Sequence, residues 1–337
     1  MIQKKDKGTV VTIGEVMMRL SPPPFQRLQQ THQFDVHYGG SEANVAVSLA
    51  QWGLDTEHVS RFPENELGQA AIAHLRSHGV STQHVDVGDG RLGTYFLEHG
   101  TDQRSSKVLY DRAGSAFAHI DPSRFDWEEI LADAKWLHWS GITPAISQAA
   151  ADTCYDAIRA ARKLGVTISG DINYRRNLWQ YGKTARDVMP TLIAETDVVI
   201  GGLTDFENCV GIAASDFTDA CRQLQRQFPA VKTIANTYRE ELSSSQQKIS
   251  ASWWDGKSLL TGRTYTLTSI ADRVGAGDAF VAGLIYGSLT EWTKQVTLDF
   301  ALAACTLKHS VPGDVNRVSV SEVQALVKGV NIGKLLR

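Results

Sequence analysis

Asp272-Arg273-Val274-Gly275-Ala276-Gly277-Asp278 is the stretch that constrains this chain most strongly, and it runs directly into a helical pattern at residues 279–285. The small residues at positions 275 to 277 let main-chain N–H groups converge where the helix begins. These groups lack intrahelical partners, and together with the helix dipole they favour an anion. Asp278 then lies in the first turn, where its carboxylate could accept a proton from an attacking hydroxyl during phosphoryl transfer. The alternative is an acidic residue that simply favours the first turn beside a tight glycine bend.

Outward from this stretch, short apolar runs alternate with amphipathic segments along most of the chain. The apolar runs are flanked by turn residues, which is typical of buried strands in a parallel sheet. The amphipathic segments have the 3.6-residue spacing of helices that connect such strands and cover both faces of the sheet. The sequence therefore predicts an α/β fold with three layers, α/β/α, around a mostly parallel central sheet. The predicted strands are 10–14, 58–62, 136–140, 167–171, 198–201 and 233–236, and the predicted helices are 42–52, 68–78, 147–164, 218–228, 276–286 and 293–308.

Two stretches interrupt this alternation, at about residues 16–38 and 92–112. The first contains Pro22-Pro23-Pro24, and the second contains two short runs, 94–98 and 107–111, that predict a hairpin. We expect these strands to form a small β-sheet that stands off the main one as a lid. Since no low-complexity linker, charge block or repeat suggests a boundary, residues 1–337 are interpreted as a single domain.

The composition excludes several classes of protein. The chain has 337 residues, 42% of them hydrophobic and 21% charged, which is ordinary for a globular protein with a large core. Its 34 Lys and Arg against 37 Asp and Glu give a net charge of −3, so we expect no binding to nucleic acid or to a membrane surface. Residues 1–7 are basic, but the apolar run after them is about five residues long, shorter than the ~7–15 residues of a secretion signal.

The cysteines and histidines indicate the redox compartment and the kind of metal site to expect. The four cysteines are widely spaced and form no CxxC pattern, which favours a reduced, cytoplasmic setting. The ten histidines show no paired metal-ligand spacing, so a metal cage built from side chains is not expected. Trp253 and Trp254 are interpreted as core or edge packing rather than as a stacking platform.

A second glycine-rich stretch, at residues 39–46, helps to interpret the stretch 272–278. Gly39-Gly40-Ser41-Glu42-Ala43-Asn44-Val45-Ala46 resembles the N-terminal glycine signature of the pfkB carbohydrate kinases, which have a ribokinase-like fold. The stretch that ends at Asp278 resembles the C-terminal signature of the same family, and the resemblance runs from about residue 10 to 329. It implies an ATP- and Mg²⁺-dependent sugar kinase with Asp278 as catalytic base. The main chain of Gly275, Ala276 and Gly277 is then the anion hole.

Within that family, several segments resemble most closely the kinases that act on 2-keto-3-deoxygluconate. These segments are Gly14-Glu15 with residues 19–23, and residues 139–144, 171–175, 178–179 and 308–314. A keto-deoxy sugar acid presents a carboxylate, several hydroxyls and a primary alcohol, so its site needs a cation, hydrogen-bonding groups and a base. We therefore expect phosphorylation of its terminal hydroxyl by ATP.

The resemblance also implies which residues bind the sugar: Gly40, Asn44, Tyr95, Tyr110, Arg112, Arg175 and Asp314. Strand alternation would place Val108, Tyr110 and Arg112 on one face of a lid strand. Arg175 follows a predicted strand at the edge where open α/β sheets bind ligands. The alternatives are ordinary structural roles: a solvated sheet face for the lid residues, a surface ion pair for Arg175, and turns or a helix cap for the others.

Nucleotide binding is assigned by the same resemblance to Asn173, Thr237 and Arg239. The nucleotide loop expected at residues 233–240 lacks the family's usual glycines. Where the family has an Asn-x-x-Glu motif that helps to organise magnesium and phosphate, this sequence has Gly202 and Asp205. We therefore expect Mg²⁺ to arrive with ATP, held by phosphates and water, with Asp205 reaching it only through water.

Two rival interpretations stay open at this stage, and a third is disfavoured. The first is another pfkB kinase, of the fructokinase or ribokinase type, and the second is a non-catalytic sugar or nucleotide binder, motivated by Gly202 and the unusual loop. A dinucleotide oxidoreductase is disfavoured because Gly14-Glu15 after the first strand offers no GxGxxG. Whichever holds, we expect a homo-oligomer formed through the outer face of the lid.

Overall fold

A mostly parallel central sheet organises the molecule. The computed structural model describes residues 8–330, so the basic residues 1–7 lie outside it. Within this range nine strands form the sheet in the order β14-β13-β12-β11-β10-β9-β1-β4, with β15 also paired to β13. Neighbours from β4 to β12 pair in parallel, and β13 is antiparallel to β12, β14 and β15. The strands are β1 Thr9–Ile13, β4 Thr56–Val59, β9 Ala134–Ser140, β10 Thr167–Asp171, β11 Val198–Ile200, β12 Thr233–Glu241, β13 Gln247–Trp254, β14 Leu259–Thr261 and β15 Tyr265–Leu267.

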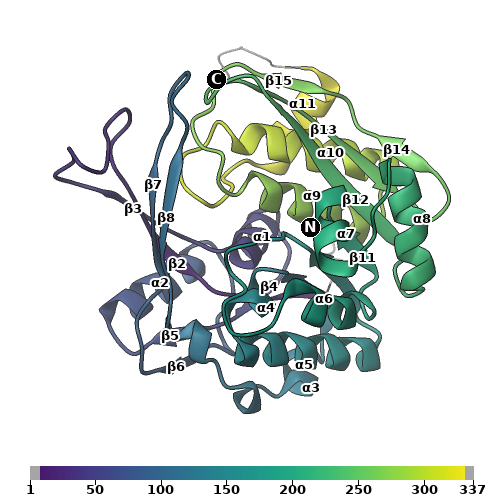
Figure 1. Cartoon of the computed structure of the whole chain (residues 1–337), viewed down its shortest axis with the longest axis horizontal. Helices are drawn as coiled ribbons and strands as arrows, with labels where there is room; N and C mark the ends of the chain where they lie inside the picture. The colour runs from purple at the N-terminus through teal and green to yellow at the C-terminus, as the bar shows by residue number, and fades with distance from the viewer. Residues whose placement is uncertain (1–7, 331–337) are drawn as a thin grey trace, which may run out of the picture.

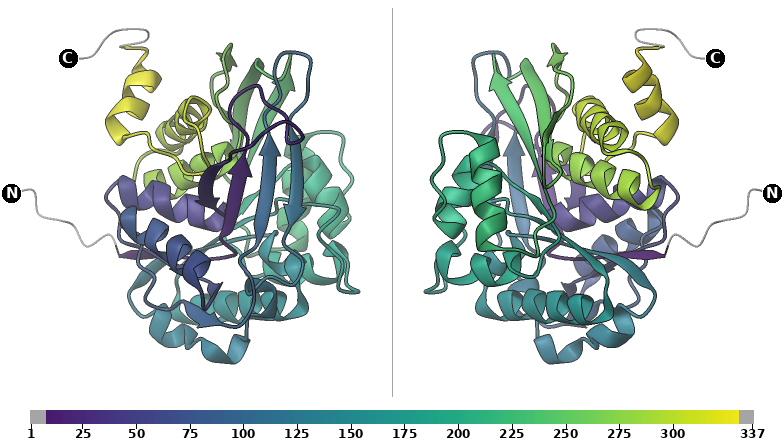
Figure 2. Two further views of the ribbon diagram at one scale, coloured as in Figure 1. Left: turned by 90° about the vertical axis from the view of Figure 1, so that its left-hand side faces the viewer. Right: turned by 90° about the vertical axis from the view of Figure 1, so that its right-hand side faces the viewer.

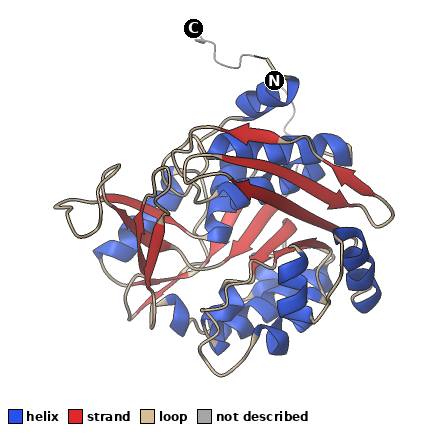
Figure 3. Cartoon of the chain, turned by 45° about the horizontal axis from the view of Figure 1, so that its top comes forward, coloured by secondary structure: helices blue, strands red, loops and turns tan. Residues whose placement is uncertain are grey.

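Helices cover both faces of this sheet (Figure 1 and Figure 3), so the predicted three-layer arrangement is confirmed. Adjacent side chains on a strand point to opposite faces, and Trp136 and Leu137 accordingly belong to different hydrophobic clusters. One layer contains α1 Ser41–Gln51, α2 Glu66–Ser77, α9 Ala276–Leu289, α10 Lys294–Lys308 and α11 Val320–Lys328. The other contains α3 Trp127–Ile130, α4 Thr143–Ile146, α5 Gln148–Leu164, α6 Ala185–Ile193, α7 Leu203–Val210 and α8 Phe217–Gln227, with short 3₁₀ turns at Phe117–His119 and Pro122–Arg124. None of the helices between residues 8 and 330 combines the length and apolarity that a bilayer crossing requires.

The predicted lid is a separate small sheet (Figure 2). Its four strands are β2 Met17–Ser21, β3 Asp35–Gly39, β7 Thr94–Glu98 and β8 Lys107–Asp111. Their order is β3-β2-β7-β8, and the hairpin predicted at 94–98 and 107–111 is confirmed as β7 and β8. A further pair of short strands, β5 Arg61–Pro63 and β6 Asp86–Gly88, lies apart from both sheets.

Several predicted elements differ from the structure at their ends, and two differ in a way that affects the interpretation. The strand predicted at 58–62 is divided between β4 and β5, with Ser60 between them. The strand predicted to end at 236 continues to Glu241, so the expected nucleotide loop is in fact extended strand. The reason is its partner β13, whose alternate residues Ile249, Ala251 and Trp253 are buried in the core and hold the whole length of β12 in an antiparallel hairpin.

Candidate active site

A cleft of about 1050 Å³ lies between the lid and the carboxyl ends of the central strands. It brings together most of the residues that the sequence singled out. Those that line it are Gly40, Asn44, Tyr95, Tyr110, Asn173, Arg175, Asp205, Thr237, Arg239, Gly275, Gly277, Asp278 and Asp314. Ala276 is fully buried and contributes its side chain to the core beneath α9. This is the edge of an open α/β sheet at which ligands bind.

The glycine bend forms the floor of this cleft. Gly275 has a φ of 79° and is the residue from which α9 begins. A Cβ at this position would lie 1.9 Å from the carbonyl oxygen of Asp314, so only glycine fits here. Among the described residues no side chain caps this helix, which leaves the N–H groups of its first turn directed at the cleft. The geometry is that of an anion-binding helix N-terminus.

Asp278 lies in that first turn with its carboxylate held from two sides. Its Oδ1 accepts a hydrogen bond from Ser41 Oγ at 3.1 Å, and its Oδ2 accepts one from Asn44 Nδ2 at 2.7 Å. Both donors come from the start of α1, so the two glycine-rich stretches of the sequence meet here. Burial raises the pKa of Asp278 to about 6, although both hydrogen bonds act in the opposite direction. A carboxylate with such a pKa can accept a proton near neutral pH.

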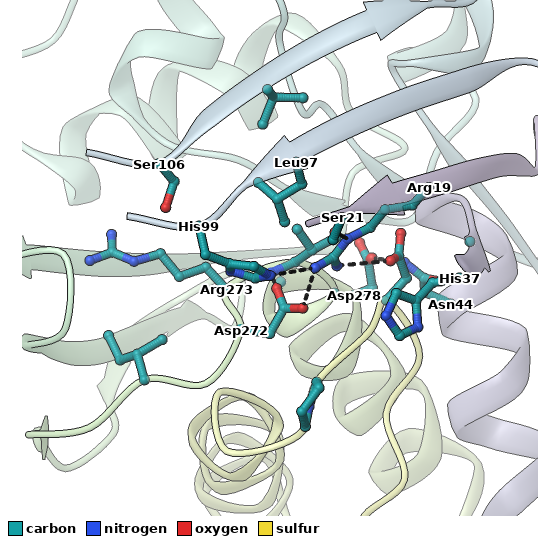
Figure 4. A pocket seen from close by; sticks show the side chains of 18 of the residues that line it. Arg19, Ser21, His37, Asn44, Leu97, His99, Ser106, Asp272, Arg273 and Asp278 are labelled. Atoms are coloured by element: carbon teal, nitrogen blue, oxygen red, sulfur yellow. Dashed lines mark hydrogen bonds and ion pairs between the residues drawn. The ribbon is translucent and has the colours of Figure 1, made fainter. Parts of the chain in front are cut away.

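A buried charge network ties the lid to this floor, and sequence reasoning gave it no role. Figure 4 shows one end of the Arg19 guanidinium in contact with both Asp272 and His99, and Arg19 is fully buried on β2. Its Nη2 donates to Asp272 Oδ2 at 2.6 Å, and its Nη1 donates to Asp314 Oδ1 at 3.0 Å. Asp314 also accepts a hydrogen bond from Tyr95 of β7. Burial would raise the pKa of Asp272, but the charges of Arg19 and Lys308 and the hydrogen bonds to the carboxylate together hold that pKa below its ordinary value.

Arg112 does not lie where strand alternation was expected to place it. Val108 and Tyr110 line the cleft as predicted, but β8 ends at Asp111 and Arg112 is not among the lining residues. Its Nη2 forms an ion pair with the buried carboxylate of Glu15, which would otherwise lack a compensating charge. The role of Arg112 towards a sugar carboxylate therefore stays a prediction, and the exposed Arg175 is the cation predicted to bind the sugar that does line the cleft.

Three carboxylates, those of Asp171, Asp205 and Asp278, lie close enough in the cleft to interact. Burial, together with the charges of Asp205 and Asp278, raises the pKa of Asp171 to about 8. Asp205 accepts hydrogen bonds from the main-chain N–H groups of Gly202 at 2.8 Å and Tyr174 at 3.2 Å, so both of its oxygens are already engaged. Within residues 8–330 no three His, Cys, Asp or Glu side chains are grouped so as to hold a metal ion.

Sequence reasoning also missed Asn236, which lines the cleft beside Gly202. A Cβ at Gly202 would lie 3.1 Å from both Asn236 Oδ1 and Nδ2, so an amide already occupies the space that an asparagine at 202 would need. Asn173 lies close by with a φ of 39°, a conformation that asparagine tolerates, and its Nδ2 donates to Ser41 Oγ at 3.4 Å. Thr237 and Arg239 extend this wall along β12.

Gly40 has a structural reason to be glycine as well as a predicted functional one. A Cβ there would lie 2.0 Å from the carbonyl oxygen of Glu15. The backbone of Gly40 is extended, so packing against Glu15 rather than a turn explains this glycine, and close approach to a sugar stays a prediction.

Known proteins are similar to this chain over nearly its whole length. The family model described as pfkB family carbohydrate kinase matches residues 7–318. The solved structure of 2-dehydro-3-deoxygluconokinase from Thermotoga maritima is 42% identical, covers 96% of this chain and 100% of its own, and has a TM-score of 0.91. The 2-dehydro-3-deoxygalactonokinase of Haloferax volcanii is 29% identical over 96% of this chain and 98% of its own length.

A more distant solved structure, described as a ribokinase II from E. coli in complex with ATP and Mg²⁺, is 19% identical with a TM-score of 0.81, which shows a shared fold alone. It covers 96% of this chain and 99% of its own. The expected ribokinase-like fold is therefore confirmed, as is a phosphotransferase that acts on a sugar. From the match across both glycine-rich stretches and nearly the whole chain, we conclude that the protein belongs to the pfkB family of carbohydrate kinases.

Proposed function

We propose that this chain transfers the γ-phosphoryl group of ATP to the terminal hydroxyl of 2-keto-3-deoxygluconate. The observation that carries the proposal is the Asp278 carboxylate, whose pKa burial raises to about 6, beside the unoccupied N–H groups of the first turn of α9. Both face a cleft that contains the exposed cation Arg175. The names of the Thermotoga and Haloferax relatives support a keto-deoxy sugar acid as the acceptor.

In the proposed mechanism Asp278 accepts the proton of the sugar hydroxyl as its oxygen attacks the γ-phosphorus. Ser41 and Asn44 hold the carboxylate in position through their hydrogen bonds to its two oxygens. The N–H groups of Gly275, Ala276 and Gly277 stabilise the negative charge of the group in transfer. Closure of the lid would exclude water, which would otherwise compete with the sugar as acceptor.

The nucleotide side is assigned to Asn173, Thr237 and Arg239, which line one wall of the cleft. Mg²⁺, bound with ATP, would offset the charge of its phosphates. The donor set fits such an ion, because burial and the charges of Asp205 and Asp278 raise the pKa of Asp171, and a nearby cation would offset both effects. Asp171 accepts one main-chain hydrogen bond, from the N–H of Asn173 to its Oδ1 at 3.1 Å, and lines the cleft where it would face the ion. Asp205 would reach the ion only through water, because both of its oxygens already accept hydrogen bonds from main-chain N–H groups.

For the acceptor, we assign the sugar carboxylate to Arg175 and the hydroxyls to Asn44, Tyr95, Tyr110 and Asp314. A guanidinium suits a carboxylate because it can donate two parallel hydrogen bonds. A neutral sugar would leave this cation without its counter-charge, so a fructokinase or ribokinase activity is the weaker alternative.

The direct test is a coupled ATP-consumption assay with Mg²⁺ and a panel of acceptors: 2-keto-3-deoxygluconate, its galactonate epimer, fructose and ribose. We expect kcat/KM to be highest for one or both keto-deoxy acids, with the phosphate on the terminal oxygen by ³¹P NMR. A preference for a neutral sugar would contradict the substrate assignment. Heat of binding in a calorimeter without ATP consumption would indicate a non-catalytic binder.

We also propose that two copies of the chain associate through the outer face of the lid. Cross-strand pairing aligns one apolar row over all four lid strands, made of Val36, Leu20, Phe96 and Leu109. Their sequence neighbours Arg19, His37, Tyr95 and Val108 line the cleft, so this row faces away from it. Val36 is 51% exposed and Leu109 is 55% exposed. Sedimentation velocity should show a dimer for the wild type and a monomer for Leu109→Asp, and a wild-type monomer at micromolar concentration would contradict the proposal.

A cytoplasmic setting is proposed on the cysteines. All four of them, Cys154, Cys209, Cys221 and Cys305, are buried free thiols, as expected for a reducing compartment. Mass spectrometry after alkylation of the denatured protein should find four reduced cysteines, and a disulfide would contradict this setting.

A further inference from the structure

Lys308 is a fully buried lysine that the mechanism above does not use. It is the last residue of α10 and is 0% exposed. Its Nζ donates to the carbonyl oxygens of Val311 at 3.0 Å and Gly313 at 2.8 Å. Burial of an ammonium group costs folding free energy unless its N–H donors are satisfied, so a lysine at this buried position needs a structural or functional reason.

The lysine lies directly under the anion hole. A Cβ on Gly275 would be 3.3 Å from Lys308 Cε, which places the aliphatic stem of the lysine against the bend that starts α9. Gly313, whose carbonyl accepts from Lys308, donates its own N–H to Asp272 Oδ2 at 2.9 Å. Asp272 in turn accepts from the N–H of Val274 at 3.0 Å. The two segments that border Gly275 are thus joined through Lys308 and Asp272.

Charges of both signs meet around this point. Arg19 and Lys308 supply two positive charges, Asp272 and Asp314 supply two negative ones, and the carboxylate of Asp278 also acts on Lys308. Burial lowers the pKa of Lys308, and the charges of Asp272 and Asp314 oppose that change. Without the lysine, two buried carbonyl oxygens would lose their donor and the cluster would carry an excess negative charge beneath an anion-binding turn.

The oxygens that Lys308 contacts are also of the kind that bind monovalent cations, since main-chain carbonyls replace the hydration shell of such ions. The structure assigns to Lys308 the part of a tethered monovalent cation: it holds the anion-hole turn at Gly275 in place, so that phosphoryl transfer needs no soluble monovalent cation. This inference rests on the proposed kinase function and deepens it. Lys308 touches no reacting atom in this scheme and is a positioning residue.

The test compares Lys308→Ala, which leaves space beside the two carbonyls, with Lys308→Met, which fills that space without a charge. Lys294→Ala is the control, because Lys294 stands at the opposite end of the same helix with its side chain 46% exposed. All proteins are assayed with Mg²⁺ and ATP in tetramethylammonium buffer, and then with added K⁺ or NH₄⁺.

We expect the wild type and Lys294→Ala to be indifferent to K⁺ and NH₄⁺. Lys308→Ala should lose kcat by on the order of 100-fold, as for removal of an anion-hole donor, and regain about tenfold or more with a saturable dependence on K⁺ or NH₄⁺. Lys308→Met should stay slow in every buffer. Severalfold stimulation of the wild type by K⁺, a wild-type kcat in Lys308→Ala, or a loss that no cation restores would each overturn the inference.

A second readout does not need a sugar acceptor. The thermal midpoint of Lys308→Ala should rise with K⁺ or NH₄⁺, whereas that of the wild type should not. If this difference is seen but no sugar acid is phosphorylated, the proposed function fails and the tethered cation stands. If Lys308→Ala does not fold in any buffer, Lys308→Arg tests the inference in its place. Lys308→Arg should keep kcat within about tenfold of the wild type. A kcat as low as that of Lys308→Met would overturn the inference.

Discussion

Removal of the Asn44 amide should move the acidic limb of the pH–rate profile to higher pH. Asn44 Nδ2 donates to Asp278 Oδ2 at 2.7 Å and stabilises the charged carboxylate, whose pKa is about 6. In Asn44→Ala this stabilisation is lost, so the pKa of Asp278 rises and more of the enzyme is protonated at a given pH.

The magnitude follows from the strength of the bond. A hydrogen bond to a charged group contributes about 1.5–3 kcal/mol, and a pKa unit corresponds to about 1.4 kcal/mol. Asp278 is only half-buried, so water can replace part of the lost donation. We therefore expect the lower end of the range, an upward shift of about one pH unit.

The assay is kcat/KM against pH from roughly 5 to 9, because this parameter reports the pKa values of the free enzyme. Asn208→Ala is the matched control, since Asn208 bonds to Thr204 on α7 and does not line the cleft. Asn44 is also a predicted sugar ligand, so the height of the profile can fall, and only the position of the limb tests the argument. An acidic limb that stays in place, or moves to lower pH, would refute the assignment of Asp278 as the titrating base.

Three further predictions concern the frame of the site. Gly275→Ala should lower the free energy of unfolding in urea by about 2 kcal/mol or more. The control Gly165→Ala has a similar φ of 72° but no atom within 4 Å of a Cβ, so it should cost only about 1 kcal/mol. Equal losses for the two variants would contradict the close approach of Gly275 to Asp314. Arg112→Ala should destabilise the fold by roughly 3 kcal/mol, because Glu15 stays buried without its partner. Arg175→Ala should leave the stability unchanged and raise KM for acid sugars more than for neutral ones. The reverse pattern would make Arg112 the carboxylate ligand. Arg19→Met should cost about 3–5 kcal/mol in the same urea assay because Asp272 and Asp314 lose their shared counter-charge, and a loss below about 1 kcal/mol would contradict the network.

The layered fold could be predicted from the sequence because its determinants are local. Buried parallel strands such as 167–171 are short apolar runs, and β10 has the predicted bounds. The anion-hole bend could be predicted for the same reason, since consecutive small residues before a helical pattern determine it. The hairpin of β7 and β8 likewise follows from two alternating runs close together in the sequence.

What could not be predicted depends on contacts between distant residues. Arg19 lies 253 positions from Asp272 and 295 positions from Asp314, and no local pattern indicates that these residues meet. The only local signal for this network is an arginine within the otherwise apolar run 17–20, which could have suggested a buried charge but not its partner. In the same way, the extension of β12 through the exposed residues Tyr238 to Glu241 depends on pairing with β13 rather than on its own composition.

Arg112 illustrates a different limit. Alternation along a strand applies only within the strand, and β8 ends one residue earlier, at Asp111. The buried carboxylate of Glu15 then decides where the guanidinium lies.

The most direct test of the account is kcat of Asp278→Asn with saturating ATP, Mg²⁺ and 2-keto-3-deoxygluconate, measured beside the sugar's dissociation constant from calorimetry. The amide preserves the shape of the side chain but cannot take up the hydroxyl proton. The account predicts that kcat falls by roughly 10²- to 10⁴-fold while the dissociation constant changes little. A kcat within a few fold of the wild type would contradict it.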